Sequence, residues 1–236
     1  MVDVSDIPND ASATGTAEER RAFQQAFITQ VNGTAALANV GGPAVVATTT
    51  SATVVAKAVT GAMLFDKGAI LSYGGAAVEL PPQLPQLENS ATRTGNLAVT
   101  VATLVADPYT PPSLPPLPAA IVEIDVWSNG VKLLIGDLAK PIRILIPLRN
   151  NTKVEKNVKL SCAWLDKTGQ WWSTEGCQTV GPVNRTSSLQ PVPRKSLECE
   201  CVHLTAFSGI WEKLQHVLQC SNYELLSHES FDRIGN

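Results

Sequence analysis

The stretch that decides the fold is Cys199-Glu-Cys-Val-His-Leu-Thr-Ala-Phe207. In an extended strand, side chains two residues apart point to the same face. Cys199, Cys201, His203 and Thr205 are therefore predicted to share one face of a strand. A Cys-x-Cys loop is too tight for the two cysteines to bond each other without strain. Each of them is expected to bond a cysteine on another strand.

Cys162 and Cys177 are the available partners, and three tryptophans, Trp164, Trp171 and Trp172, lie close to them in the sequence. Clustered cysteines with tryptophans are typical of disulfides packed on aromatic rings in an oxidising compartment. Two such bridges would stabilise the fold by roughly 3–4 kcal/mol each in the chain-entropy account. The alternative is a zinc ion bound by Cys199, Cys201, His203 and a further cysteine. The fifth cysteine, Cys220, has no evident partner.

His203 and Thr205 are candidates for a general base and a nucleophile. An imidazole with a pKa near neutrality can take the proton of a hydroxyl that it contacts. The activated oxygen of Thr205 would attack the carbonyl of Leu204, forming an ester that water then hydrolyses. This chemistry would cut the chain between Leu204 and Thr205. The simpler interpretation of His203 is a hydrogen-bonded, partly buried histidine.

Working outward from this stretch, four segments alternate between apolar and polar residues. They are predicted to be antiparallel strands with one buried face: 97–101, 122–126, 142–146 and 158–164. Proline-rich stretches at 81–85 and 108–118 interrupt them as long loops or a linker. The fold class is therefore mainly β, a sandwich over residues 67–210.

The ends of the chain have a different pattern. Thr16 and Glu19 form a capping box that begins an amphipathic helix over 18–31. A second helix is predicted over 55–63, where apolar residues keep helical spacing. Residues 1–66 are expected to be a helical, partly disordered region, and residues 211–236 a helical tail that also carries His216 and His228.

Composition excludes some classes of function. The net charge is −3 and no basic cluster exists, which argues against nucleic acid as a partner. No run of eighteen apolar residues is present, so a membrane span is not predicted. The start carries no signal peptide, and we interpret the chain as a fragment of a longer precursor. Asn32, Asn150 and Asn184 begin Asn-x-Ser/Thr sequons and are candidate glycosylation sites.

The cysteine-rich segment resembles the GPS motif, the cleavage site of the GAIN domain of adhesion G-protein-coupled receptors and polycystin-type membrane proteins. The resemblance covers residues 158–210 and rests on four strings: Cys162-Ala-Trp164-Leu-Asp166, Gly169-Gln-Trp171-Trp172-Ser173, Gly176-Cys177 and His203-Leu204-Thr205 with Phe207 after it. The helical region is shorter than in many family members.

The resemblance implies disulfides Cys162–Cys199 and Cys177–Cys201. It implies core positions at Trp164, Trp171, Gly176 and Phe207. It further implies that the cut strand stays bound and acts as a tethered agonist once exposed, with Phe207 and Ile210 as apolar anchors. That strand comprises Thr205, Ala206, Phe207, Ser208, Gly209 and Ile210.

Three functions are consistent with this sequence. The first is a self-processing extracellular module of a larger membrane protein, single-turnover rather than a turnover enzyme. The second is a non-cleaving, disulfide-bonded interaction domain of the same fold, and the third is an unrelated secreted sandwich that binds a ligand. Expected partners are the chain's own C-terminal fragment, the parent's membrane-spanning region and an extracellular ligand. No metal or other cofactor is expected.

Overall fold

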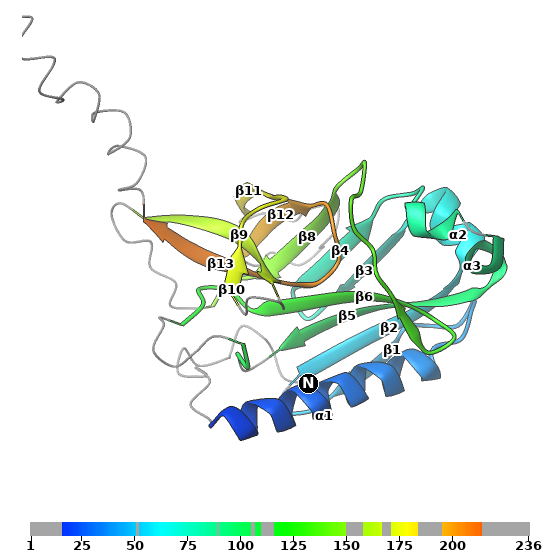
Figure 1. The fold of residues 1–236 in the computed structure, drawn as a ribbon, viewed down its shortest axis with the longest axis horizontal. Coiled ribbons are helices and arrows are strands. Elements are labelled where there is room, and N and C mark those ends of the chain that lie inside the picture. The colour runs from blue at the N-terminus through cyan, green and yellow to red at the C-terminus, as the bar shows by residue number, and fades with distance from the viewer. Residues whose placement is uncertain are drawn as a thin grey trace, which may run out of the picture.

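The computed structural model describes residues 16–50, 52–88, 90–104, 107–109, 116–149, 158–166, 171–183 and 195–213. Within them, two antiparallel sheets face each other (Figure 1). The larger sheet has the order β1-β2-β5-β6-β13-β9-β10, with β7 also paired to β6, and the smaller has the order β11-β12-β8-β4-β3. The elements are α1 (Ala17–Leu37), β1 (Val45–Thr48), β2 (Ala52–Thr60), α2 (Gly61–Lys67), β3 (Ala69–Tyr73), β4 (Ala76–Leu80), the 3-10 turn η2 (Pro85–Leu87), α3 (Ser90–Thr94), β5 (Asn96–Leu104), β6 (Ile121–Ser128), β7 (Val131–Leu133), β8 (Ile142–Pro147), β9 (Val158–Asp166), β10 (Trp171–Ser173), β11 (Cys177–Val183), β12 (Ser196–Cys201) and β13 (Ala206–Lys213).

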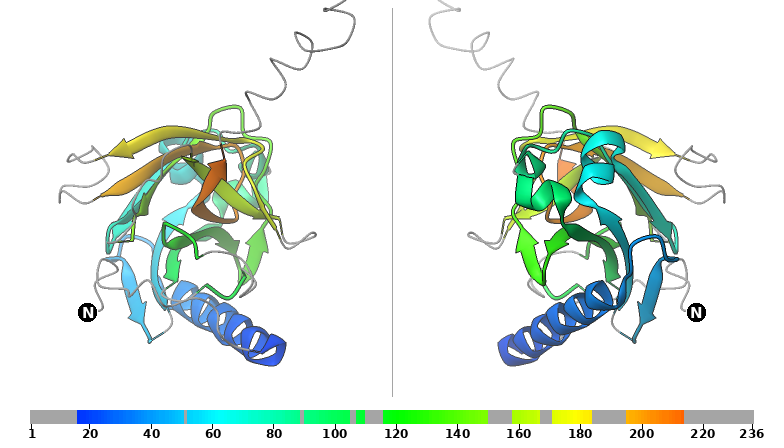
Figure 2. Two further views of the ribbon diagram at one scale, coloured as in Figure 1. Left: turned by 90° about the vertical axis from the view of Figure 1, so that its left-hand side faces the viewer. Right: turned by 90° about the vertical axis from the view of Figure 1, so that its right-hand side faces the viewer.

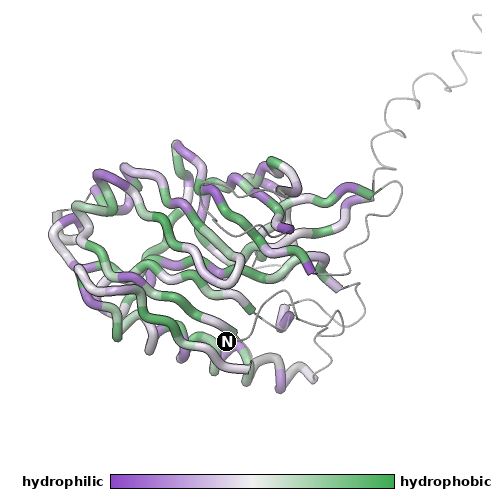
Figure 3. Tube along the Cα trace, turned by 180° about the vertical axis from the view of Figure 1, so that it is seen from behind, coloured by the Kyte–Doolittle hydropathy of each residue, from purple (hydrophilic) through white to green (hydrophobic). Residues whose placement is uncertain are grey.

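The molecule has three layers, because α1 lies on the larger sheet on the side away from the smaller one (Figure 2). One apolar cluster fills the space between the sheets and includes Ile124, Ile144 and Phe207. A second cluster lies between α1 and the larger sheet and includes Phe27 and Val31. Figure 3 shows hydrophobic residues concentrated along the strands and hydrophilic residues at the turns.

The helix predicted over 18–31 is confirmed and continues to Leu37. Thr16 caps it: the Glu19 backbone N–H donates to the Thr16 hydroxyl, and the Thr16 backbone N–H donates to the Glu19 carboxylate. These two bonds satisfy helix N–H groups that otherwise lack partners. The apolar face of α1, with Phe27 and Val31 buried, then packs on β2 and β5.

The helix predicted over 55–63 is wrong, because Ala52–Thr60 form strand β2, which pairs along its whole length with β5. Only the seven residues Gly61–Lys67 that follow are helical. Strand β2 lies between α1 and the smaller sheet and is buried on both faces. Its sequence therefore lacks the alternation of apolar and polar residues that marks a half-exposed strand. Its β-branched residues favour a strand when both faces are covered.

The predicted boundary at residue 67 does not separate the sandwich from what precedes it, since β1 and β2 belong to the larger sheet. The tail predicted as helical from 211 begins differently, because β13 runs on to Lys213. Residues 214–236, with Cys220, His216 and His228, lie outside the described residues, as do residues 1–15. The strands predicted at 97–101, 122–126, 142–146 and 158–164 are all present. β5, β6 and β8 differ from the prediction of one buried face, because both faces of these strands are mostly buried.

Candidate functional site

The chain changes sheets between Cys201 and Ala206. Strand β12 pairs with β8 in the smaller sheet, whereas β13 pairs with β6 and β9 in the larger one. Residues 202–205 form the bend that joins them. The single strand predicted from Cys199 to Phe207 is therefore wrong. Because β12 and β13 lie in different sheets, the chain bends where it crosses between them.

Two disulfides hold the strand before the bend. Cys162 and Cys199 are bonded, with Cα atoms 5.8 Å apart, and this bridge joins β9 of the larger sheet to β12 of the smaller. Cys177 and Cys201 are bonded between neighbouring strands, where they lie directly opposite each other. The pairing implied by the family resemblance is thus present. Because all four sulfurs are paired, they cannot serve as the thiolates of the alternative zinc site.

Backbone hydrogen bonds fix the peptide that joins Leu204 to Thr205. On one side, the Leu204 N–H donates to the carbonyl of Ile135, with N and O 2.9 Å apart. On the other side, the Thr205 carbonyl accepts from the Ile124 N–H at 3.1 Å. The two bonds flank the 204–205 peptide and leave its own carbonyl and N–H outside these interactions. The peptide is thus held at both ends within a bend of the chain.

Val202, at the start of the bend, is held in the same way. Its N–H donates to the carbonyl of Gly176 at 3.1 Å, and its carbonyl accepts from the Leu138 N–H at 2.9 Å. The loop after β7 therefore contacts the bend twice, through Ile135 and Leu138. A loop far away in sequence thus sets the path of the chain through the bend.

The imidazole of His203 lies partly buried between two aromatic rings. Trp164 meets it edge-on, with ring centroids 4.5 Å apart, and the ring of Phe207 lies 5.8 Å away. The Trp164 indole N–H donates to the Glu175 carbonyl at 2.6 Å, which fixes that ring. The Nε2 atom of His203 is buried, and no described residue forms a hydrogen bond with it. The simpler interpretation of a hydrogen-bonded histidine therefore does not account for this nitrogen.

Burial lowers the pKa of His203 below its ordinary value of 6.5, and the negative charge of Asp137 partly opposes this. Burial acts in this direction because it disfavours the charged imidazolium. The ring is therefore neutral at pH 7 and has a nitrogen able to accept a proton. Neutrality is the state that a general base at this position requires.

Gly176 is an exposed turn residue rather than the core residue predicted. Its φ is +71°, a backbone region that glycine adopts without strain. A Cβ there would also lie 3.1 Å from the Cγ2 of Val202, and His203 ring atoms lie just beyond. The backbone angle therefore favours glycine, and a larger residue would also press on the Val202 side chain.

The other predicted core positions differ among themselves. Phe207 is completely buried, and Trp164 is partly buried against the main cluster. The prediction for Trp171 is wrong: its side chain is 58% exposed. Trp171 lies in the short outer strand β10, which has a neighbour on one side only, β9. An outer strand of three residues leaves a large side chain little to pack against.

The segment expected to be a tethered strand lies in the middle of the larger sheet. β13 pairs with β9 from Phe207 to Lys213 and with β6 at Ala206 and Phe207. The buried Ser208 hydroxyl donates to the Ala120 carbonyl at 3.0 Å. Ile210 is partly buried and packs on the cluster beneath α1. Figure 1 shows β13 in orange beside β9.

The loop that follows β7 is the part of the site that the sequence did not predict. Ile135, Asp137 and Leu138 surround the bend, yet they precede it by more than sixty residues. Gly136-Asp137 signals a turn, and nothing local to that turn indicates what it contacts.

Other predicted positions lie away from the bend or outside the described residues. Asn32 is exposed on α1, whereas Asn150 and Asn184 are not among the described residues. In the part of the chain that is described, no group of three or more His, Cys, Asp or Glu side chains is placed to hold a metal. None of the helices described is long and apolar enough to cross a bilayer.

Comparisons with known proteins agree with this architecture. Among solved structures, the full extracellular region of zebrafish Gpr126/Adgrg6 is similar, with a TM-score of 0.50 and 17% sequence identity. That match covers 81% of this chain and 27% of the other, so the chain spans about a quarter of that structure. At this identity the likeness shows the fold alone, and no curated protein matches. The family described as GPS: GAIN subdomain B matches residues 74–211 of 236, and because this is more than half of the sequence, the chain belongs to that family.

Proposed function

We propose that the chain is the self-cleaving extracellular module of a larger membrane protein, and that it cuts its own backbone between Leu204 and Thr205. The observation that carries the proposal is the bend itself. Its central peptide is held by backbone bonds on both sides, and a neutral histidine with an unpaired nitrogen lies beside it. The membership in a GAIN family supports the same conclusion.

The chemistry uses only side chains of the bend. A nitrogen of His203 takes the proton of the Thr205 hydroxyl, and the oxygen attacks the carbonyl carbon of Leu204. As the tetrahedral intermediate collapses, the C–N bond breaks and the imidazolium returns its proton to the leaving amine. The ester between Leu204 and the Thr205 oxygen is then hydrolysed by water. The products are a Leu204 carboxylate and a Thr205 with a free amine and hydroxyl.

The cut strand remains in place after this reaction. Strand β13 keeps its hydrogen bonds to β9 and β6, and Phe207 stays in the core between the sheets. Separating the fragments would expose this strand and leave β6 and β9 each unpaired along the edge that faced it. We therefore propose a stable non-covalent complex whose β13 strand becomes an agonist for the parent's membrane-spanning region once it is pulled out. The fold that the chain shares with an extracellular region supports a location on the outer face of a membrane.

A denaturing gel compared with native size-exclusion chromatography tests the proposal directly. The protein from a secretory host is expected to elute as one species and to give two bands in denaturant. Amino-terminal sequencing of the shorter fragment should begin at Thr205. A single band of intact chain from folded wild-type protein would refute self-cleavage and leave the fold unaffected.

The cleavage rate should increase with pH through the lowered pKa of His203. Below that pKa the imidazole is charged and cannot accept the hydroxyl proton, whereas above it the rate should be constant. The midpoint is expected below the ordinary value of 6.5. A time course of fragment formation during cell-free synthesis at a series of pH values measures it.

Asp137 supplies the comparison variant for this pH profile. Its charge raises the pKa of His203, so Asp137→Asn should shift the midpoint further toward low pH. The fold must be monitored in parallel, because a histidine buried in its neutral form also makes the folded state less stable as pH falls below 6.5. An unchanged midpoint in Asp137→Asn, or a rate independent of pH, would remove His203 from the general-base role.

A non-cleaving interaction domain is the second candidate function, and the packing of His203 favours it. The ring lies between Trp164 and Phe207, where an aromatic side chain stabilises the core without taking part in chemistry. Chemical rescue separates the two roles. If His203 acts as a base, His203→Ala should accumulate as intact chain and cleave when free imidazole is added. Rescue would not occur if the ring were structural only.

A further inference from the structure

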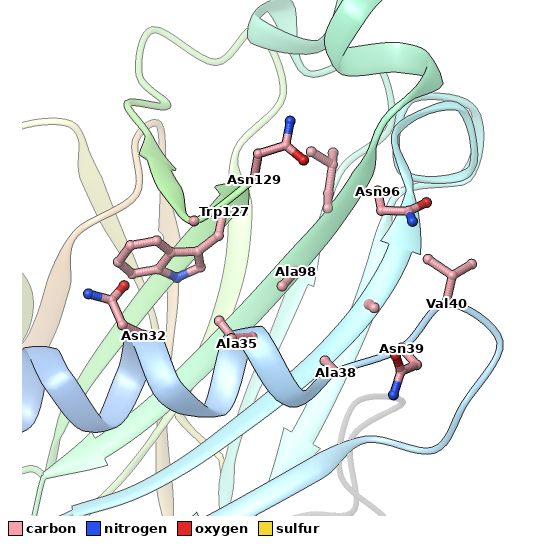
Figure 4. Close-up of a pocket in the computed structure, with 13 residues that line it drawn as sticks. Asn32, Ala35, Ala38, Asn39, Val40, Asn96, Ala98, Trp127 and Asn129 are labelled. Carbon is pink, nitrogen blue, oxygen red and sulfur yellow. The ribbon is translucent and has the colours of Figure 1, made fainter.

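A groove separate from the bend lies where the C-terminal end of α1 meets β2, β5 and the β6–β7 turn (Figure 4). Its volume is about 240 Å³, which accommodates a single sugar-sized ring. It is lined by the C-terminal part of α1, including Asn32 and Ala35, by Asn96 and Ala98 of β5, and by Trp127 and Asn129.

The lining favours a neutral ligand with many hydrogen-bonding groups. Four carboxamides line the groove, those of Asn32, Asn39, Asn96 and Asn129, and each offers two donor hydrogens and an acceptor oxygen. None of the described lining residues is charged, so neither an anion nor a cation finds a counter-ion. The groove lies at a helix C-terminus, whose partial negative charge further disfavours an anion.

The wall of the groove includes an indole held in a fixed position. Trp127 donates its ring N–H to the Thr100 hydroxyl at 3.1 Å. Figure 4 shows the indole beside the carboxamide of Asn32, with Ala35 and Ala38 along the helix below. The indole is 9% exposed, so only a small part of its surface faces the groove. That apolar part, next to planar amides, suits the apolar C–H edge of a sugar ring whose hydroxyls meet the carboxamides. The small alanine side chains leave the space open.

The sequence places a sugar attachment point on the rim of this groove. Asn32-Gly-Thr34 is a sequon, and Asn32 is exposed. Thr34 is 3% exposed, and its hydroxyl donates to the Gln30 carbonyl at 2.7 Å. The threonine is therefore packed away in the folded chain, whereas the asparagine faces the groove. A glycan added to the nascent chain would have its first ring next to Trp127.

We propose that this groove is a saccharide site that holds an N-acetylated hexose, covalently presented by Asn32 or free in solution. The site is independent of self-cleavage, because none of its residues belongs to the bend or contacts it in the ways described above. A non-cleaving variant such as Thr205→Ala is therefore expected to retain it.

Three forms of the protein from a glycosylating secretory host test the proposal: wild type, Thr34→Ser and Thr34→Val. Peptide mass spectrometry should find a glycan on Asn32 in the first two, whereas the valine variant loses the sequon and keeps Asn32. After enzymatic trimming to one N-acetylglucosamine, nuclear Overhauser contacts are expected between the sugar and the methyl groups of Ala35 and Ala98. N,N′-diacetylchitobiose titrated into Thr34→Val should shift the same methyl signals.

Two further variants separate recognition from attachment. Asn129 has a φ of +50°, so Asn129→Gly preserves the turn and removes one carboxamide. This change should weaken disaccharide binding by about two- to tenfold, as expected for one lost hydrogen bond. Gln25→Ala, which removes an exposed amide on the same helix, should change nothing.

The two sugar sources give different results. Contacts from an attached sugar identify the chain's own glycan as the occupant. An unmodified Asn32 together with disaccharide binding identifies a free saccharide. Either of two results overturns the proposal. The first is a sugar attached to Asn32 that gives no contacts with the methyl groups of the groove. The second is the absence of attached-sugar contacts in wild type together with the absence of signal shifts in Thr34→Val at millimolar disaccharide.

Discussion

Replacing Thr205 by alanine should abolish the shorter fragment completely, so that a denaturing gel shows one band of intact chain. The alanine lacks the hydroxyl that attacks the Leu204 carbonyl, and no neighbouring residue of the bend, from Val202 to Ala206, offers a hydroxyl in its place. The backbone that positions the peptide is unaffected, because the Thr205 carbonyl still accepts from the Ile124 N–H. The effect on cleavage is therefore expected to be complete, whereas the effect on the fold is small.

Thr205→Ser is the matched control, because serine keeps the hydroxyl and loses only a methyl group. It should still cleave. Since the Thr205 side chain is partly exposed, the free energy of unfolding of Thr205→Ala should stay within about 0.5 kcal/mol of that of Thr205→Val, which also lacks the hydroxyl and keeps the size of threonine. A fragment of unchanged size and amount from Thr205→Ala would show that another nucleophile or a contaminating protease makes the cut.

The disulfides were predictable, whereas the shape of the bend was not, and the reason is distance along the chain. Cys-x-Cys, the clustered tryptophans and His203-Leu204-Thr205 occur within one short stretch, so their chemistry is visible without knowledge of the fold. The bend depends on which sheet each strand joins. Alternation continues across residues 199–207, and only the pairing of β12 with β8 and of β13 with β9 shows that the chain changes sheets.

The same limit explains the error at β2. Strands β5 and β8 were predicted because apolar residues alternate with polar or small ones along them, although both faces of these strands are mostly buried. β2 is covered by α1 on one face and by the second sheet on the other, so almost all its residues are apolar or small. Such a run fits helical spacing equally well. Which interpretation is right depends on what covers each face, and that is a property of the tertiary fold.

The two tryptophans Trp164 and Trp171 differ in how far they are buried, for a related reason. Sequence proximity to cysteines suggested that both Trp164 and Trp171 pack in the core. Trp164 lies on β9, which has neighbours on both sides, and its ring meets His203. Trp171 lies on the short strand beyond β9 and remains mostly exposed. Position in the sheet, rather than membership in the motif, decides how much each ring stabilises the fold.

Phe207→Ala should lower the free energy of unfolding by about 3–5 kcal/mol, the usual cost of truncating a fully buried phenylalanine. The side chain is 0% exposed and belongs to the cluster between the sheets, where it also contacts the ring of His203. Urea unfolding of a Thr205→Ala background measures the change on an uncleaved chain. Phe207→Leu fills most of the space and should cost less than half as much.

Trp171→Ala provides an aromatic control from the same motif. Because its ring is 58% exposed, it should change stability by less than about 0.5 kcal/mol. In cleaved protein the order of effects should be the same for fragment release: Phe207→Ala speeds the loss of the shorter fragment during mild urea treatment, and Trp171→Ala does not. Equal release from the two variants would mean that the hydrogen bonds of β13 to its neighbours hold the strand without a contribution from the Phe207 anchor. Faster release from Phe207→Ala alone would make the burial of this one ring a principal barrier to exposing the strand.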